Sequence, residues 1–217
     1  MPTSTQSGRF IVFEGIDGAG TTTQVQRYAQ HVRGKRRLVH ITREPSDGPV
    51  GALLRLALAG RTTFASANLA QTMALLFAAD RLDHLTCEIM PYLRDGAVVI
   101  SDRYDLSSLV YQWASADKDA GSTDFRDWLR GLNRYARRPD ITVVLDVSPD
   151  KAEQRRRERH NAVELYEVAS LQLKLAELYR DAEALMPGDR IVHIDGDKDV
   201  EQVTAAVIEA LDPLLGR

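Results

Sequence analysis

The sequence predicts an α/β fold in which a doubly wound, five-stranded parallel sheet is flanked by helices. Five short runs are β-branched and nearly continuous in hydrophobicity, as strands buried on both faces should be. Longer amphipathic stretches separate these runs, and strand–helix–strand alternation is typical of parallel strands joined by right-handed crossovers. Ligands of such sheets bind at the carboxyl ends of the strands, so we expect the functional site at that edge.

The elements follow one another in a regular order. Strands are expected at residues 10–14 (FIVFE), 38–42 (LVHIT), 97–102 (AVVISD), 141–146 (ITVVLD) and 191–195 (IVHID). Amphipathic periodicity predicts helices at residues 22–33, 50–59, 68–92, 106–114, 124–135, 151–159, 164–185 and 200–215. Three of the strands end in an acidic residue at the expected ligand edge, namely Glu14, Asp102 and Asp146. Because no repeat or linker interrupts this pattern, residues 1–217 are expected to form one domain.

Composition excludes several classes of protein. The chain has 217 residues and a net charge of −3, with 27% charged residues, which argues against a protein that coats nucleic acid. A single cysteine, Cys87, rules out an intramolecular disulfide, and the five scattered histidines lack the spacing of metal ligands. The N-terminus is polar, without the apolar region of a secretory signal, and no run approaches the roughly 18 apolar residues of a membrane span. A cytoplasmic protein is therefore expected.

The turn after the first strand has the spacing of a phosphate-binding loop. The pattern G-x-x-x-x-G-K-[ST] fits at Gly15, Gly20 and Thr22, but Thr21 stands where the lysine belongs. Backbone N–H groups of such a loop, together with the following helix N-terminus, bind the phosphates of a nucleotide. The lysine adds charge near the β and γ phosphates, and the Ser/Thr hydroxyl reaches Mg²⁺. This segment therefore predicts a phosphoryl-transfer enzyme that lacks one of its usual cations.

Two other interpretations of the loop compete with this one. The dinucleotide fingerprint G-x-G-x-x-G fails, because Thr23 stands where a third glycine would follow Gly18 and Gly20. The plainer alternative is that the two glycines only allow a tight strand-to-helix turn. Motifs elsewhere in the chain argue against that alternative.

These further motifs lie along nearly the whole chain. They are TREP (42–45), LLFAADR (75–81), SDRYDLSSLVYQ (101–112), RPDITVVLDVSP (138–149) and EQRRRERHNAVELYE (153–167). Together with FEGIDGAGTTTQ, in this order and at this spacing, they resemble the thymidylate kinase family, which phosphorylates dTMP with ATP. The resemblance implies a P-loop kinase fold, ATP and Mg²⁺ as cofactors, a homodimer, and an arginine-rich lid at about residues 153–167.

The resemblance also implies which residues hold ATP and Mg²⁺. The ATP cradle would consist of Gly15, Gly18, Ala19, Gly20, Thr21, Thr22 and Thr23. Thr22 is expected to bind Mg²⁺ directly, and Asp102, in a Walker-B-like place, through water. The plain alternative for Asp102 is an acidic strand end that only caps a helix.

The dTMP pocket is implied in the same way. Phe77 would stack on thymine, and Arg81, one helical turn later, would point into the same pocket. Tyr111 and Gln112 follow the DRY motif, and the Gln112 amide can both donate to and accept from the thymine edge. An ordinary core phenylalanine and a surface glutamine are the competing interpretations.

Three arginines are candidates for the dTMP phosphate, because guanidinium groups bind phosphate oxygens in a bidentate fashion. They are Arg43, Arg55 and Arg103, and Arg103 is favoured because it ends the third strand beside the loop. The resemblance further implies that Glu44 and Asp17 lie near the acceptor phosphate and sugar, with contacts to the 3′-OH, Mg²⁺ or ordered water.

The chain departs from the family at the lysine. Phosphoryl transfer depends on positioning and positive charge, so the loss of one cation should slow it by about 10²- to 10³-fold. Arg155 and Arg159 share one face of the lid helix, and either could supply the missing charge, alongside Asp17 and Arg103 as catalytic residues. A solvated basic helix is the alternative. Leu165 stands where the family often has an arginine, which removes a second expected charge.

Three functions remain open from sequence. The first is a working dTMP kinase. The second is a nucleotide-binding protein with little or no kinase activity, which Thr21 and Leu165 motivate. The third is a kinase for another pyrimidine deoxynucleoside or monophosphate, because discrimination of a single methyl group is worth only about 1–3 kcal/mol.

Overall fold

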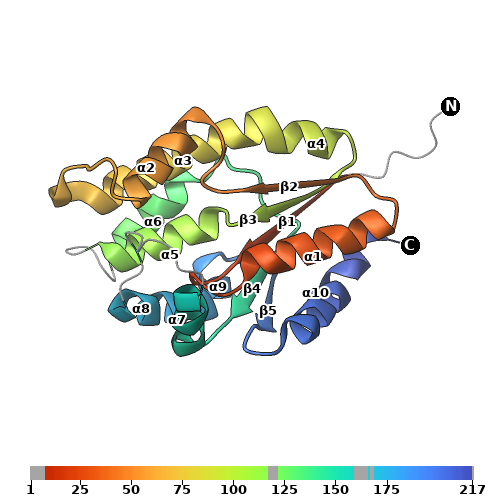
Figure 1. Ribbon diagram of the computed structural model, residues 1–217. Coiled ribbons are helices and arrows are strands. Elements are labelled where there is room, and N and C mark those ends of the chain that lie inside the picture. The colour runs from red at the N-terminus through yellow and green to blue at the C-terminus, as the bar shows by residue number, and fades with distance from the viewer. Residues whose placement is uncertain (1–7, 117–121, 159–165, 167–168, 217) are drawn as a thin grey trace.

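The computed structural model contains a parallel five-stranded sheet with the strand order β2-β3-β1-β4-β5 (Figure 1). It describes residues 8–116, 122–158, 166 and 169–216. The strands are β1 (Arg9–Glu14), β2 (Val39–Arg43), β3 (Val98–Asp102), β4 (Ile141–Asp146) and β5 (Ile191–Asp195). Every neighbouring pair is parallel, so the predicted fold class is confirmed.

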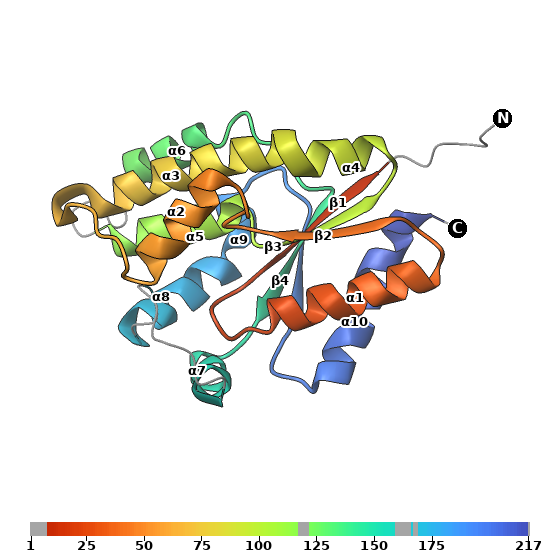
Figure 2. The ribbon, with the colours of Figure 1, turned by 45° about the horizontal axis from the view of Figure 1, so that its top comes forward.

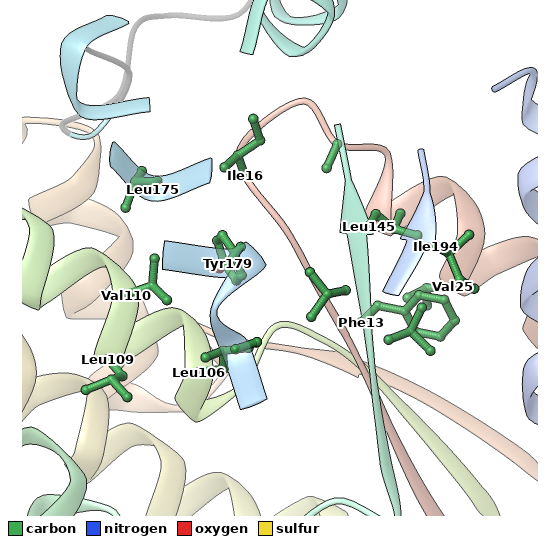
Figure 3. Close-up of a cluster of buried hydrophobic side chains, with 14 of the residues drawn as sticks. Phe13, Ile16, Val25, Leu106, Leu109, Val110, Leu145, Leu175, Tyr179 and Ile194 are labelled. Atoms are coloured by element: carbon green, nitrogen blue, oxygen red, sulfur yellow. The ribbon is translucent and has the colours of Figure 1, made fainter. Parts of the chain in front are cut away.

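Strand β1 lies in the centre of the sheet and is buried on both faces, as its continuous hydrophobicity predicts. Phe10 and Val12 belong to one apolar cluster, whereas Ile11 and Phe13 belong to another. Side chains alternate between the two faces of a strand, so these two pairs of residues point to opposite faces of the sheet. Figure 3 shows Phe13 beside Val25 of the first helix.

Helices cover both faces of this sheet (Figures 1 and 2). One face carries α1 (Thr21–Gly34) and α10 (Val200–Leu215), which also pack against each other. The other face carries α3 (Leu69–His84), α4 (Met90–Arg94), α5 (Asp105–Ser115), α8 (Ala169–Arg180) and α9 (Ala182–Leu185). The remaining helices are α2 (Pro49–Leu58), α6 (Thr123–Leu132) and α7 (Pro149–Glu158), and α7 lies beside the loop that follows β1.

Two predicted helices differ from the structure. The helix expected at residues 68–92 is α3 and α4 joined by a π-helical turn at Leu85–Ile89. The described part of the helix expected at residues 164–185 is broken between α8 and α9. There the Asp181 N–H donates to the Leu178 carbonyl at 3.2 Å, which is the three-residue spacing of a 3₁₀ turn and not the four-residue spacing of an α-helix. The Asp181 carbonyl then accepts the first hydrogen bonds of α9.

The carboxyl ends of the central strands place the expected site residues at one level. Asp102 at the end of β3 is in register with Phe13 of β1 and with Arg43 of β2. The loop at residues 15–20 follows directly from β1 and leads into α1. Within the described part of the chain, no helix has the length and apolar character needed to cross a membrane.

Candidate active site

The loop after β1 depends on two glycines in left-handed conformations. Gly18 has a φ of +91°, and a Cβ on it would lie 2.4 Å from the carbonyl oxygen of Ala152, so any side chain would collide with the backbone of α7. Gly20 has a φ of +94° and caps α1 without a side-chain hydrogen bond. The first N–H groups of α1 therefore lack a side-chain partner, and they form a ready site for an anion.

Thr22 and Asp102 meet beside this loop. The Thr22 Oγ1 donates to Asp102 Oδ2 at 2.5 Å. Asp102 Oδ1 is buried and has no hydrogen-bond partner among the described residues. A hydroxyl and a carboxylate next to a phosphate cradle fit Mg²⁺, which binds one or two protein oxygens, substrate phosphates and water. Within the same residues no cluster of three or more His, Cys, Asp or Glu side chains offers an all-protein metal site.

Arg103 is anchored to the loop. Its Nη2 donates to Asp17 Oδ1 at 2.6 Å, and its Nη1 donates to the Gly15 carbonyl at 3.0 Å. The Tyr111 hydroxyl donates to Asp17 Oδ2 at 3.0 Å, and its ring lies 5.2 Å from the Arg103 guanidinium. Burial opposes the charge on Arg103, but the oxygens of Tyr111 and Asp17 raise its pKa well above the usual value. The guanidinium therefore stays charged.

A cavity opens next to Arg103. It is lined by Asp17, Glu44, Pro45, Leu58, Phe77, Arg103, Tyr104, Ser107, Ser108, Tyr111, Gln112 and Tyr166. Six of the residues expected at the active site from sequence are on its wall, drawn from the loop, the β2 end, α3 and α5. The structure thus brings together one aromatic ring, one amide, two carboxylates, a phenol and a guanidinium.

Gln112 presents an unused acceptor in this cavity. The side chain is fully buried, and its Nε2 donates to the Tyr166 hydroxyl at 3.3 Å. Its Oε1 is buried without a hydrogen-bond partner among the described residues. A buried polar atom of this kind is costly unless a ligand or water satisfies it, and a pyrimidine N3–H is a suitable donor.

Arg81 lies behind the cavity wall and is not among its lining residues. The side chain is 1% exposed, and its Nη2 donates to Glu44 Oε2 at 2.6 Å and to Ser108 Oγ at 2.9 Å. Its Nη1 donates to Asn133 Oδ1 at 2.5 Å. Arg81 therefore contacts the cavity wall through Glu44, Ser108 and the ring of Tyr104, which lies 5.1 Å from its guanidinium.

The other two phosphate candidates lie outside the cavity. Arg55 donates to the carbonyls of Pro45 and Ser46, and so braces the turn after β2. Arg43 is exposed and pairs with Asp47 at 3.2 Å. Of the three, only Arg103 reaches both the loop and the cavity.

Helix α7 brings Arg155 onto the loop. Its Nη1 donates to the Ala19 carbonyl at 3.2 Å, and its Nη2 donates to the Gly196 carbonyl at 2.9 Å. Arg156 donates to the Asp17 carbonyl at 2.5 Å. Thr21 is buried at the start of α1. Arg159 and Leu165 lie outside the described residues.

Sequence reasoning missed several residues of this site. Tyr104, Ser107 and Ser108 lie on the same stretch as Tyr111 and Gln112, and helical spacing could have identified Ser107 and Ser108 as neighbours of the pocket. Gln172 and Tyr179 come from α8, where the sequence carries no comparable signal. Gln172 Nε2 approaches Asp17 Oδ2 at 3.5 Å, and the Tyr179 hydroxyl contacts Arg103 at 3.3 Å.

The chain is similar to known proteins along nearly its whole length. The family model described as thymidylate kinase matches residues 13–207. A "Probable thymidylate kinase" of Thermococcus kodakarensis is 40% identical over 211 residues, which cover 95% of this chain and 98% of that protein. Proteins of the same description from Pyrobaculum aerophilum and Pyrococcus horikoshii are 39% and 35% identical, each over 93% of this chain and over 95% and 96% of their own length.

Proposed function

Because the chain belongs to the thymidylate kinase family, we propose that it transfers the γ-phosphoryl group of ATP to dTMP, giving dTDP. The observation that carries this proposal is the contact between the phosphate-binding loop and the cavity. Asp17 and Arg103 both lie on the cavity wall; Asp17 belongs to the phosphate-binding loop, and Arg103 donates to Asp17 and to the Gly15 carbonyl of that loop. An acceptor phosphate on Arg103 would therefore lie beside the phosphates of a donor nucleotide on the loop.

The acceptor fits the cavity through its base and its phosphate. Phe77 would stack on the thymine ring, and Gln112 Oε1 would accept from its N3–H. Tyr111 and Glu44 would contact the sugar, while Arg103 would bind the phosphate. An oxygen of that phosphate would attack the γ-phosphorus as the bond to the β–γ bridging oxygen breaks, with ADP as the leaving group. Arg81 is assigned here to holding Glu44 in place, and its direct contact with the nucleotide stays a prediction.

The donor side uses the loop backbone from Gly15 to Thr23 for the ATP phosphates. Thr22 and Asp102 would hold Mg²⁺, Thr22 directly and Asp102 through water. When bound, Mg²⁺ would neutralise charge that develops on the phosphoryl oxygens. Residues 1–217 would form one catalytic domain, with the lid at about 153–167, in a cytoplasmic homodimer.

Arg155 is the cation that we assign to the role of the absent lysine. Its guanidinium already lies on the loop at Ala19, and its Nη1 is 4.0 Å from the position of a Cβ on Gly20. Its hydrogen-bond partners within the described part of the chain are carbonyl oxygens, which it could exchange for phosphate oxygens. Such an exchange replaces neutral acceptors by charged ones, which strengthens the hydrogen bonds.

The test is steady-state, ATP-dependent phosphorylation of dTMP by four proteins. Wild type should turn over, and Arg155→Ala should lower kcat by about 10²- to 10³-fold. Thr21→Lys, introduced into Arg155→Ala, should restore much of that loss. Arg157→Ala is the matched control, because this arginine of the same helix is 78% exposed and pairs with Glu153. It should keep a kcat near that of wild type.

Binding measurements separate this proposal from the alternative of a nucleotide-binding protein without useful turnover. If wild type binds dTMP and ATP but produces no dTDP, whereas Thr21→Lys gains activity, the protein is a kinase fold that has lost its catalytic cation. Competition between dTMP, dUMP and thymidine identifies the acceptor.

A further inference from the structure

One hydroxyl from α8 reaches the centre of the active site. The Tyr179 hydroxyl lies 3.1 Å from Glu14 Oε2, 2.9 Å from Ser107 Oγ and 3.3 Å from Arg103 Nη1. Its side chain is 2% exposed, and Figure 3 shows the ring in the apolar layer with Leu106, Val110 and Leu175. The ring is therefore fixed by packing, and its oxygen is delivered to three groups of the site at once.

The Tyr179 hydroxyl donates a hydrogen bond to Glu14. This carboxylate at the end of β1 is fully buried, and burial raises its pKa. It accepts from the Tyr104 N–H at 2.9 Å, the Ser107 N–H at 3.2 Å and the Ser107 Oγ at 2.5 Å. The Tyr179 hydroxyl completes this set of donors. Since burial raises the pKa of Tyr179 well above its usual value as well, the hydroxyl keeps its proton.

The same oxygen accepts a hydrogen bond from Arg103. The backbone of Arg103 has a φ of +74°, a left-handed conformation that is uncommon for a residue with a side chain. Its backbone N–H donates to the Phe13 carbonyl at 2.8 Å, which fixes the main chain in that conformation. The guanidinium then uses Nη1 for Gly15, Ser107 and Tyr179, and one proton of Nη2 for Asp17. Among the described residues these bonds do not use the Nε–H of Arg103, which could donate to a phosphate.

We infer that Tyr179 is a positioning residue for binding of the dTMP phosphate: it holds the Arg103 guanidinium in the orientation that a monophosphate requires. It does so by donating to Glu14 and accepting from Arg103, and it touches no substrate atom itself. This inference rests on the proposed function, since it needs dTMP as the ligand of Arg103. It predicts an effect on the phosphate of the acceptor and none on its nucleoside part.

The experiment compares Tyr179→Phe with Tyr28→Phe, using dTMP and thymidine as separate ligands in calorimetric titrations. Both variants lose one buried hydroxyl, but the Tyr28 hydroxyl has no hydrogen-bond partner among the described residues and lies on α1. Tyr179→Phe should weaken dTMP binding by about tenfold, the effect of one hydrogen bond to a charged group, and leave thymidine binding unchanged. Tyr28→Phe should change neither.

Steady-state kinetics give a second measurement. In Tyr179→Phe the KM for dTMP should rise by about the same factor, while the KM for ATP stays at the wild-type value. Ser107→Ala approaches the same contacts from α5, and it should reproduce the selective loss of dTMP affinity if Tyr179→Phe does not fold.

Each outcome decides the matter. Equal weakening of dTMP and thymidine would show that Tyr179 only supports the fold, and unchanged dTMP binding would show that Arg103 needs no support. Either result overturns the inference and leaves the proposed function standing. Wild-type protein that binds neither dTMP nor thymidine would overturn the proposed function itself.

Discussion

The buried ion pair between Arg81 and Glu44 should be a point where the loss of one partner is far more harmful than the loss of both. The two side chains are 1% and 2% exposed and lie 2.6 Å apart. Glu44 also contacts His84 at 3.3 Å, and Arg81 contacts Ser108 and Asn133. We consider three variants: Arg81→Met, Glu44→Gln, and the two combined.

The expected magnitudes follow from burial. Arg81→Met leaves the Glu44 carboxylate inside the protein without its cation, which should lower the free energy of unfolding by about 3–5 kcal/mol. Glu44→Gln leaves Arg81 charged, but Ser108 and Asn133 still accept hydrogen bonds from it. The free energy of unfolding should therefore be lowered by about 3 kcal/mol, the lower end of that range. In the double variant no uncompensated charge remains, and the total loss should be smaller than that of Arg81→Met alone. The coupling between the two sites should therefore be about 3 kcal/mol or more, since it exceeds the loss of Glu44→Gln alone.

The assay is urea unfolding followed by circular dichroism, with equal m-values required for all variants. Arg27 and Glu201 supply the control, because they form an ion pair of 3.1 Å whose side chains are 39% and 72% exposed. Arg27→Met should lower the free energy of unfolding by no more than about 1 kcal/mol. The reasoning fails if Arg81→Met is no worse than Arg27→Met, or if the losses of the two single variants simply add in the double variant.

Three further predictions concern the loop, the pocket and the C-terminal helix. Gly18→Ala should lower the free energy of unfolding by about 1–3 kcal/mol, because Gly18 has a left-handed φ and its new Cβ would lie 2.4 Å from a carbonyl oxygen. Gly34→Ala is the control and should be neutral or stabilising, because no atom lies within 4 Å of the new Cβ. Equal effects of the two substitutions in urea unfolding would contradict this prediction. Gln112→Leu should raise the KM for dTMP by about 10- to 100-fold through loss of a buried amide partner, with the KM for ATP unchanged, and a shift in both constants would point to general damage. Burial opposes the charge on Asp212, but hydrogen bonds from Lys35 and His31 outweigh burial and lower the pKa of this carboxyl group. The stabilisation that Asp212 provides is therefore present above the unfolded pKa of about 3.9 and is lost as pH falls through the lower folded pKa. Asp212→Asn should reduce the loss of unfolding free energy at acid pH, and an unchanged pH dependence would refute this.

The sequence was sufficient for those features that depend on local patterns. The strands of the sheet are continuous apolar runs, and β4, β5 and α10 have the predicted bounds. The loop glycines are recognisable because their spacing reflects backbone conformations that other residues rarely adopt. The cavity residues on α3 and α5 were expected because the motifs that contain Phe77, Tyr111 and Gln112 resemble those of the thymidylate kinase family.

The remaining features depend on partners that are distant in sequence. Arg81 was expected to point into the pocket, and helical spacing does bring it near, but its direction is set by Glu44, Ser108 and Asn133. No periodicity along one helix can show that three acceptors from three other segments will hold a guanidinium. Tyr179 was missed for the same reason, since its role depends on Glu14, 165 positions away.

Asp17 connects the loop after β1 with the cavity. It lies in the loop, it lines the cavity, and its carboxylate is shared by Arg103 and Tyr111, while its carbonyl accepts from Arg156 of the lid helix. In the proposed complex, ATP on the loop and dTMP on Arg103 would therefore act on the same side chain. Thermodynamic linkage then requires reciprocity: if bound ATP changes the affinity for dTMP by some factor, bound dTMP changes the affinity for ATP by the same factor. Heterotropic cooperativity between donor and acceptor can thus arise from one carboxylate, without any domain having to move.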